Sequence, residues 1–197
     1  MSSDQNNMSG ATQEISTVRW LIETALLVLL AFVLAQGIKT YLVQAFVIPS
    51  GSMIPTIHEG DRVFAEKITY RFLRGPERGD VIVFHNPDYD PVDAQANPPI
   101  LIKRVIAVEG QTVDLKDGNV VVNGRVLDEP YTHGKPSDPL DPAIRYPLKL
   151  AKGTMWVMGD NRTNSGDSRA LGPVKVKAAI GRAVWTYWPL NAFGKLR

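Results

Sequence analysis

The order of hydrophobic and polar positions divides the chain into three parts. Residues 1–18 are mainly polar and show no apolar periodicity, which predicts a disordered N-terminal tail. Residues 20–38 are apolar almost throughout, and as a helix they would extend roughly 28 Å, close to the hydrocarbon thickness of a bilayer. We therefore predict a single transmembrane helix over residues 19–39 and a separate domain over residues 40–197.

Two other interpretations of the apolar segment compete with a membrane anchor. A buried core helix is one of them, because the uninterrupted apolar run covers only residues 25–35. A cleavable signal peptide is the other, but it would need a basic start and a small-residue cleavage site, whereas Arg19 is the single basic residue before the run. Arg19 and Lys39 flank the segment on opposite sides, so charge alone does not give its orientation.

Beyond the apolar segment, Pro and Gly recur at short intervals between short apolar runs, which favours a mainly β body. We expect strands at residues 44–48, 62–67, 80–85, 101–109, 112–115, 119–122, 125–127, 154–158 and 180–188. Asp117-Gly118 and Asn123-Gly124 supply residues that tolerate positive φ, as tight hairpin turns require. The polar, Pro-rich stretches 86–99 and 128–147 are predicted to be surface excursions.

Composition and charge exclude several classes of chemistry. The chain has no Cys, so thiol nucleophiles, disulfides, Cys-ligated zinc and iron–sulfur clusters are excluded. The three His residues are far apart without an HExxH pattern, and neither a metal nor another cofactor is expected. Lys plus Arg number 22 against 20 Asp plus Glu, a net charge of +2 with scattered basic residues, so nucleic acid is not an expected partner.

A serine in the segment IPSGSMIPT is the first candidate for catalysis. Pro49 and Pro55 stiffen this segment and Gly51 allows close approach of the backbone, so Ser52 would lie on a rigid loop. An ordinary Ser/Gly turn would look the same, and a nucleophilic serine also needs a base, which a His, a carboxylate or a Lys could supply.

Lys103 is the most suggestive base, because it lies in an apolar strand, LIKRVIAV. A buried lysine loses its proton more readily, since burial disfavours the ammonium. The alternative is that Lys103 and Arg104 are merely the polar positions of an alternating strand; their side chains alternate, so we expect that both cannot point inward.

A third segment, MGDNRTNSGDSRALGP, concentrates charged and polar residues just after an apolar strand. By itself it could be a surface loop held by Asx turns and Asp/Arg pairs.

Taken together, these segments resemble the type I signal peptidases, the bacterial leader peptidases. The stretches FVIPSGSMIPTIHEGD, RGDVIVF, LIKRVIAVEG and MGDNRTNSGDSR follow an apolar anchor in that family's order. Thr163 departs from the family, since an acidic residue is expected there in many members. The resemblance implies a signal-peptidase-like β-sheet catalytic domain behind a single transmembrane helix.

The resemblance also implies a role for each matching residue. Ser52 would be the nucleophile and Lys103 the general base, with Ser50 contributing to the oxyanion hole and Ser165 positioning the lysine amine. Residues that would support this wall of the site are Asp160, Asn161, Arg162, Asp167 and Arg169. The substrate side chain just before the scissile bond would be bound by Ile48, Pro49, Met53, Ile57 and Ile102, and the third one by Phe46 and Ile48.

The resulting hypothesis is a membrane-anchored Ser/Lys endopeptidase that removes signal peptides from exported preproteins after small residues, the Ala-x-Ala pattern. Its partners would be preprotein signal peptides, membrane lipid and the protein export machinery. It would be a single-pass protein of a bacterial plasma membrane, with a cytoplasmic N-terminus and an extracytoplasmic catalytic domain. Two rivals are a self-cleaving repressor-type Ser/Lys protease and a tethered β-rich binding module without catalysis.

A cluster of aromatic residues near the C-terminus, Trp185, Tyr187, Trp188 and Phe193, allows two interpretations. The side chains could rest on the lipid surface, or they could pack in the core.

Overall fold

The computed structural model describes residues 5–93 and 98–196, and the chain divides into two compact units, Met1–Leu42 and Val43–Arg197. The first unit contains the helix α1, Gln5–Tyr41. Within it, Thr17–Ile38 is long and apolar enough to cross a membrane. Its large apolar side chains are exposed, as few soluble proteins would tolerate, so this segment is a candidate membrane span.

Helix α1 begins earlier than the composition predicts. Residues 1–4 of the expected disordered tail lie outside the described residues, whereas residues 5–18 are helical. A helix that is already nucleated adds one hydrogen bond for each further residue, so an apolar helix can extend into a polar sequence that would not form one alone.

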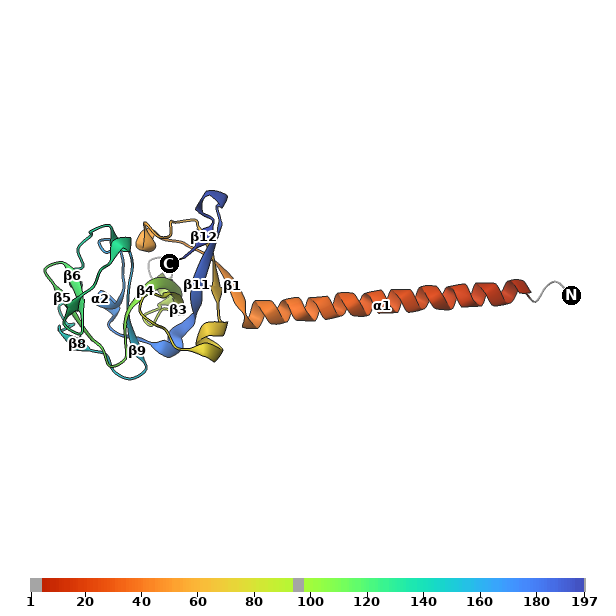
Figure 1. The fold of residues 1–197 in the computed structure, drawn as a ribbon, viewed down its shortest axis with the longest axis horizontal. Coiled ribbons are helices and arrows are strands. Elements are labelled where there is room, and N and C mark those ends of the chain that lie inside the picture. The colour runs from red at the N-terminus through yellow and green to blue at the C-terminus, as the bar shows by residue number, and fades with distance from the viewer. Residues whose placement is uncertain (1–4, 94–97, 197) are drawn as a thin grey trace. The chain divides into compact units, whose positions relative to one another are not determined.

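The second unit is mainly β and is built on a curled antiparallel sheet (Figure 1). Along this sheet the strands follow the order β1-β2-β11-β3-β4-β9-β10, and β12 pairs with β11. Their bounds are β1 Val43–Val47, β2 Arg62–Glu66, β3 Val81–His85, β4 Ile100–Val108, β9 Thr154–Met158, β10 Val174–Lys175, β11 Ala179–Trp188 and β12 Gly194–Lys195. A single helical turn, α2 Ser168–Leu171, lies between β9 and β10.

A smaller sheet follows the order β7-β6-β5-β8 and lies at one side of the same unit (Figure 1). Its strands are β5 Thr112–Lys116, β6 Asn119–Val122, β7 Arg125–Val126 and β8 Leu148–Lys149. Asp117 and Asn123 adopt φ values of 52° and 51°, so both hairpin turns have the left-handed backbone that their sequences predict.

The strands predicted from the apolar runs are all present, each within one residue of its expected ends. The two-residue strands β8, β10 and β12 are not predicted, since so short a strand has no periodicity to detect. β7 is equally short, but the Asn123-Gly124 turn before it marks its place.

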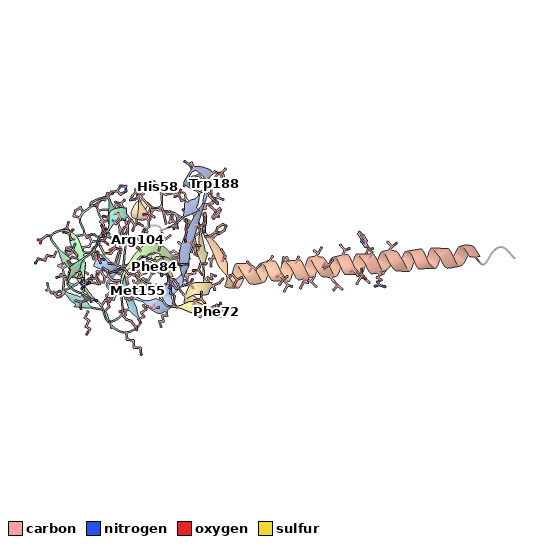
Figure 2. All side chains as sticks on the ribbon, viewed as in Figure 1. His58, Phe72, Phe84, Arg104, Met155 and Trp188 are labelled. Atoms are coloured by element: carbon pink, nitrogen blue, oxygen red, sulfur yellow. The ribbon has the colours of Figure 1, made fainter. Side chains whose placement is uncertain are left out.

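Among the described residues, three buried clusters make up the core. One lies under β1, β2 and the Ser52 loop, the second lies between the two sheets around Trp156, and the third surrounds Phe84 and Met155. Figure 2 shows Phe84, Arg104 and Met155 inside the β unit, and Phe72 and Trp188 at its edge.

The C-terminal aromatic residues do not join this core. Trp185, Trp188 and Phe193 are 41%, 49% and 61% exposed. Tyr187 is partly buried and stacks on Phe64, with ring centroids 4.1 Å apart. Core packing, one of the two interpretations, therefore does not hold for the three exposed rings.

Candidate active site

Ser52 and Lys103 meet in the interior of the β unit, although they are 51 positions apart in the sequence. Ser52 lies on a 3₁₀ turn, Gly51–Met53, and Lys103 lies in β4. The Lys103 Nζ donates a hydrogen bond of 2.7 Å to the Ser52 Oγ, and the two residues are 3% and 6% exposed. This is the spacing that proton transfer from a hydroxyl to an amine requires.

The loop that carries Ser52 is closed at its base by β-type hydrogen bonds. The Ile48 N–H donates to the Asp61 carbonyl and the Gly60 N–H donates to the Ile48 carbonyl, each at 2.9 Å. Met53 and Ile57 are fully buried in the core below the loop. The nucleophile candidate therefore sits on a loop that is fixed at both ends and from beneath.

The environment of Lys103 favours the neutral amine. Burial lowers its pKa to about 8 from an ordinary 10.5, while Asp167 and Asp160 raise it and Arg169 lowers it further. An appreciable fraction of the amine is then unprotonated near neutral pH, as a general base needs.

Both Lys103 and Arg104 are buried, contrary to the expectation that only one could point inward. Adjacent side chains of a strand do point to opposite faces, but β4 is covered on both of them. Arg104 forms a two-pronged ion pair with Asp160, at 2.8 and 2.7 Å, and its guanidinium lies 4.1 Å from the centre of the Tyr131 ring.

The segment after β9 packs directly against the Ser52 loop. The Asn161 N–H donates to the Ser52 carbonyl at 3.0 Å, and its Nδ2 donates to the Gly51 carbonyl at 2.9 Å. Gly159 permits this approach, because a Cβ there would overlap both the Ser52 carbonyl and the Ser165 Oγ. The contact therefore depends on glycine at position 159.

The two serines with predicted supporting roles lie beside the dyad. The Ser50 hydroxyl donates to the Ser52 Oγ at 3.4 Å, a long hydrogen bond. The Ser165 Oγ is buried against Gly159, and none of the described residues forms a hydrogen bond with it. Ser165, expected to position the Lys103 amine, thus forms no hydrogen bond with it in this structure.

The remaining predicted support residues form buried ion pairs. Arg169 binds Asp167 through two nitrogens, each at 2.9 Å, and Asp167 also accepts the Gly159 N–H at 3.0 Å. Arg162 binds both carboxylate oxygens of Glu129 at 2.7 Å. These pairs hold the loop after β9 rigidly behind the dyad.

An apolar cavity of about 240 Å³ opens beside Ser52 and Lys103. Four of the predicted substrate-binding residues line it, namely Phe46, Ile48, Pro49 and Ile102. Val83, Ile100 and Leu101 also line it. Met53 and Ile57, the other two predicted, are fully buried in the core and do not line this cavity.

Sequence reasoning missed several residues that shape the site. Glu129, Tyr131 and Lys135 come from the stretch that was predicted to be a surface excursion, yet all three contact the arginines or the asparagine behind the dyad. Charged residues in a Pro-rich stretch look the same whether they face water or a buried partner, so no local signal marks them. Within the described part of the chain, no group of three or more His, Cys, Asp or Glu side chains could hold a metal ion.

Comparison with known proteins shows the family of this chain. A family model described as signal peptidase, peptidase S26, matches residues 21–188. The chain belongs to this family. The signal peptidases are serine peptidases, so the protein is a hydrolase that acts on preprotein signal peptides.

Relatives match this signal peptidase over most of its length. It is 43% identical over 172 residues to signal peptidase I of Leptolyngbya laminosa, and the match covers 85% of this chain and 79% of that protein. It is 43% identical over 167 residues to the probable signal peptidase I-2 of Synechocystis, with 84% and 72% covered. With the probable signal peptidase I-1 of the same organism, identity is 39% over 178 residues, with 90% and 88% covered.

Proposed function

We propose that this chain is a membrane-anchored endopeptidase that cleaves signal peptides from exported preproteins with Ser52 as nucleophile and Lys103 as general base. One observation carries the proposal. It is the 2.7 Å hydrogen bond between a buried serine hydroxyl and a buried lysine amine whose pKa lies near 8. A surface serine in an ordinary turn would have no such partner.

The geometry supports a two-step acyl transfer. Lys103 takes the Ser52 proton as the Oγ attacks the scissile carbonyl, and the resulting ammonium then donates this proton to the leaving amine. Water activated by the same amine hydrolyses the acyl-enzyme. The developing oxyanion would be bound by the Ser52 N–H and the Ser50 hydroxyl, and the Ser165 hydroxyl would orient the amine once substrate orders the site.

The cavity supports a preference for small residues before the scissile bond. Its walls are bulky aliphatic and aromatic side chains, and Ser52 lines it as well. In an extended substrate, the first and third side chains before the scissile bond point to the same side. Both would therefore enter this cavity, while the second side chain faces away. Overfilling a packed pocket costs about 1 to 3 kcal/mol and displaces the carbonyl from the nucleophile.

Helix α1 supports the proposed location. Its apolar stretch Thr17–Ile38 would anchor the peptidase in a bacterial plasma membrane as a single-pass protein, with the N-terminus cytoplasmic and the catalytic domain outside. Preproteins delivered there by the export machinery would meet the enzyme in the same plane, at a raised effective concentration.

The proposed dyad is tested by single and double substitutions. We expect Ser52→Ala and Lys103→Ala each to abolish cleavage of a preprotein in detergent, and the double variant to be no worse, because the two groups act as a unit. The measurement is the cleavage rate beside a thermal melt, and the exposed Lys152→Ala serves as the lysine control. A folded Ser52→Ala that still cleaves would overturn the dyad. If the wild-type chain cleaves no preprotein, so that neither substitution changes its activity, the tethered binding module is the better interpretation.

The specificity is tested with one preprotein carrying Ala, Leu or Phe at the first and third positions before the bond. We expect Leu and Phe to slow cleavage by about 5-fold or more at either position, as the cost of overfilling implies. Changes at the second position should have little effect. Equal rates across the series would contradict the proposed cavity.

A further inference from the structure

Lys135 reaches the active-site loop from the segment that connects β7 to β8 of the smaller sheet. Its Nζ donates a hydrogen bond of 2.6 Å to the Asn161 Oδ1. The amide nitrogen of the same asparagine, Nδ2, donates to the Gly51 carbonyl at 2.9 Å. Lys135 is partly buried and Asn161 is 7% exposed, so this chain of bonds lies largely out of solvent.

The direction of the asparagine amide follows from its two partners. An ammonium can only donate, so it must face the amide oxygen, and a carbonyl can only accept, so it must face the amide nitrogen. The backbone N–H of Asn161 also donates to the Ser52 carbonyl at 3.0 Å. Asn161 therefore holds the peptide units on both sides of Ser52.

The Gly51 carbonyl belongs to the same peptide unit as the Ser52 N–H. In a planar trans peptide these two groups point in opposite directions, so fixing the carbonyl also fixes the direction of the N–H. A hydrogen bond to the carbonyl also polarises the unit and strengthens its N–H as a donor. The positive charge of Lys135 does the same for the Asn161 amide.

We propose that Lys135 is a positioning residue for catalysis, acting through Asn161 and the Gly51 carbonyl to aim and polarise the Ser52 N–H toward the transition-state oxyanion. This inference rests on the proposed function, because it needs Ser52 to be the nucleophile. It assigns to the segment Glu129–Ser137 a part in the chemistry, although none of its residues lines the cavity beside Ser52.

The segment that carries Lys135 is fixed on both sides of it. Arg162 binds Glu129 through two nitrogens, and its Nη1 also donates to the Ser137 Oγ. The Ser137 N–H donates to the Gly118 carbonyl at 2.8 Å. These contacts fix the backbone on both sides of Lys135, within reach of Asn161.

The experiment measures preprotein cleavage by full-length Lys135→Met, Lys135→Arg and Asn161→Ala variants in detergent. Removing an oxyanion donor outright costs about 100-fold or more, and Lys135→Met only weakens one, so we expect kcat/KM to fall about 5- to 30-fold. Lys135→Arg keeps a donor and the charge and should recover most of the loss. The exposed Lys152→Met makes the same change in charge and should retain wild-type activity.

Two readouts separate this role from a merely structural one. A peptide boronic acid forms a tetrahedral adduct with a serine, and its inhibition constant should rise in parallel with the loss of kcat/KM. The affinity for an uncleaved substrate peptide, measured in the Ser52→Ala background, should not change with Lys135→Met. The double variant Lys135→Met/Asn161→Ala should match Asn161→Ala alone within about twofold, because the effect passes through Asn161.

Unchanged kcat/KM in Lys135→Met would overturn the inference, and so would additive losses in the double variant or a loss confined to substrate affinity. Failure of the proposed function gives a different result. In that case Ser52→Ala would still cleave, whatever Lys135 does.

Discussion

At the scale of single residues, the decisive feature is a lysine that the fold keeps out of water. β4 is buried on both faces, so Lys103 is only 3% exposed, and its amine meets the Ser52 hydroxyl. Asp160 and Asp167 raise this pKa and so partly offset the effect of burial. They act by their charge at a distance. The site therefore balances desolvation against remote negative charge to keep the pKa near 8.

The pKa of Lys103 predicts the pH dependence of cleavage. The amine must be neutral to accept the Ser52 proton, so activity should rise through an apparent pKa of about 8 and level off above it. Lys103→Arg should be inactive at every pH, because a guanidinium stays protonated. The measurement is kcat/KM between pH 6 and pH 10, and a flat profile would count against Lys103 as the base.

The same shift predicts a difference in stability. The folded protein binds fewer protons than the unfolded chain between the folded pKa near 8 and the ordinary 10.5, so the burial of the ammonium destabilises the fold below pH 8. This penalty fades as the pH rises toward 10.5. Lys103→Met should therefore gain more stability over the wild type at pH 7 than at pH 10, measured by denaturant unfolding; an equal gain at both pH values would contradict the shift.

At the scale of elements, the turn between β9 and α2 forms the rear wall of the site. Asp167 caps α2 by accepting the Arg169 N–H, pairs with the Arg169 guanidinium and accepts the Gly159 N–H. Both members of the pair are buried, at 0% and 1% exposed. The Asp167 carboxylate thus links the end of β9 to the helical turn, and its charge also raises the pKa of Lys103.

Asp167→Asn should separate the structural part of this wall from the catalytic part. An unpaired buried guanidinium costs about 3 to 5 kcal/mol of unfolding free energy, whereas the dyad itself stays in place and activity should be lost only in part. Because Asp167 raises the pKa of Lys103, its neutralisation should also move the activity profile to lower pH. Denaturant unfolding and a pH series measure the two effects.

The matched control is Glu77, an exposed carboxylate that lies 3.5 Å from the partly buried Arg74. Glu77→Gln should change stability by less than about 1 kcal/mol, because an exposed carboxylate contributes little to an ion pair and Arg74 keeps Asp80 as a partner. A fully stable but inactive Asp167→Asn, or one whose activity profile is unmoved, would contradict the assigned role.

At the scale of the whole molecule, the chain separates its candidate membrane segment from its chemistry. The unit boundary lies at Leu42/Val43, three residues beyond the boundary predicted from hydropathy. β1 starts directly at Val43 and pairs with β2, and its Phe46 lines the cavity. Every residue of the proposed site therefore belongs to the second unit.

Deletion of residues 1–42 should leave a folded peptidase domain. We expect it to cleave a soluble signal-peptide substrate at close to the full-length rate, and a preprotein embedded in vesicles more slowly, because the shared plane is lost. Deletion of residues 1–48 removes β1 and should destabilise the domain as well. Thermal melts and both cleavage assays measure this, and a 43–197 fragment that fails to fold with detergent present would refute the boundary.

Hydrophobic periodicity and local motifs were enough to predict much of this protein. They identified the apolar helix, the longer strands and both hairpin turns, because an apolar run and an Asp-Gly or Asn-Gly pair act on the backbone at their own position. The family resemblance named Ser52 and Lys103, and the structure brings them into contact. Family membership rests on residues 21–188, which span all of these motifs.

The tertiary structure decided what covers each side chain. The sequence could not show that both faces of β4 are buried, because Arg104 is covered by Asp160 and Tyr131 from distant segments. It placed Met53 and Ile57 in the substrate pocket, whereas packing beneath the loop takes them into the core. From the sequence alone Lys135 would be taken for a surface lysine, and only the fold shows that it binds Asn161. Periodicity in the sequence indicates the face of the strand to which a side chain points. The residues that it contacts there come from distant parts of the chain, and only the folded structure brings them together.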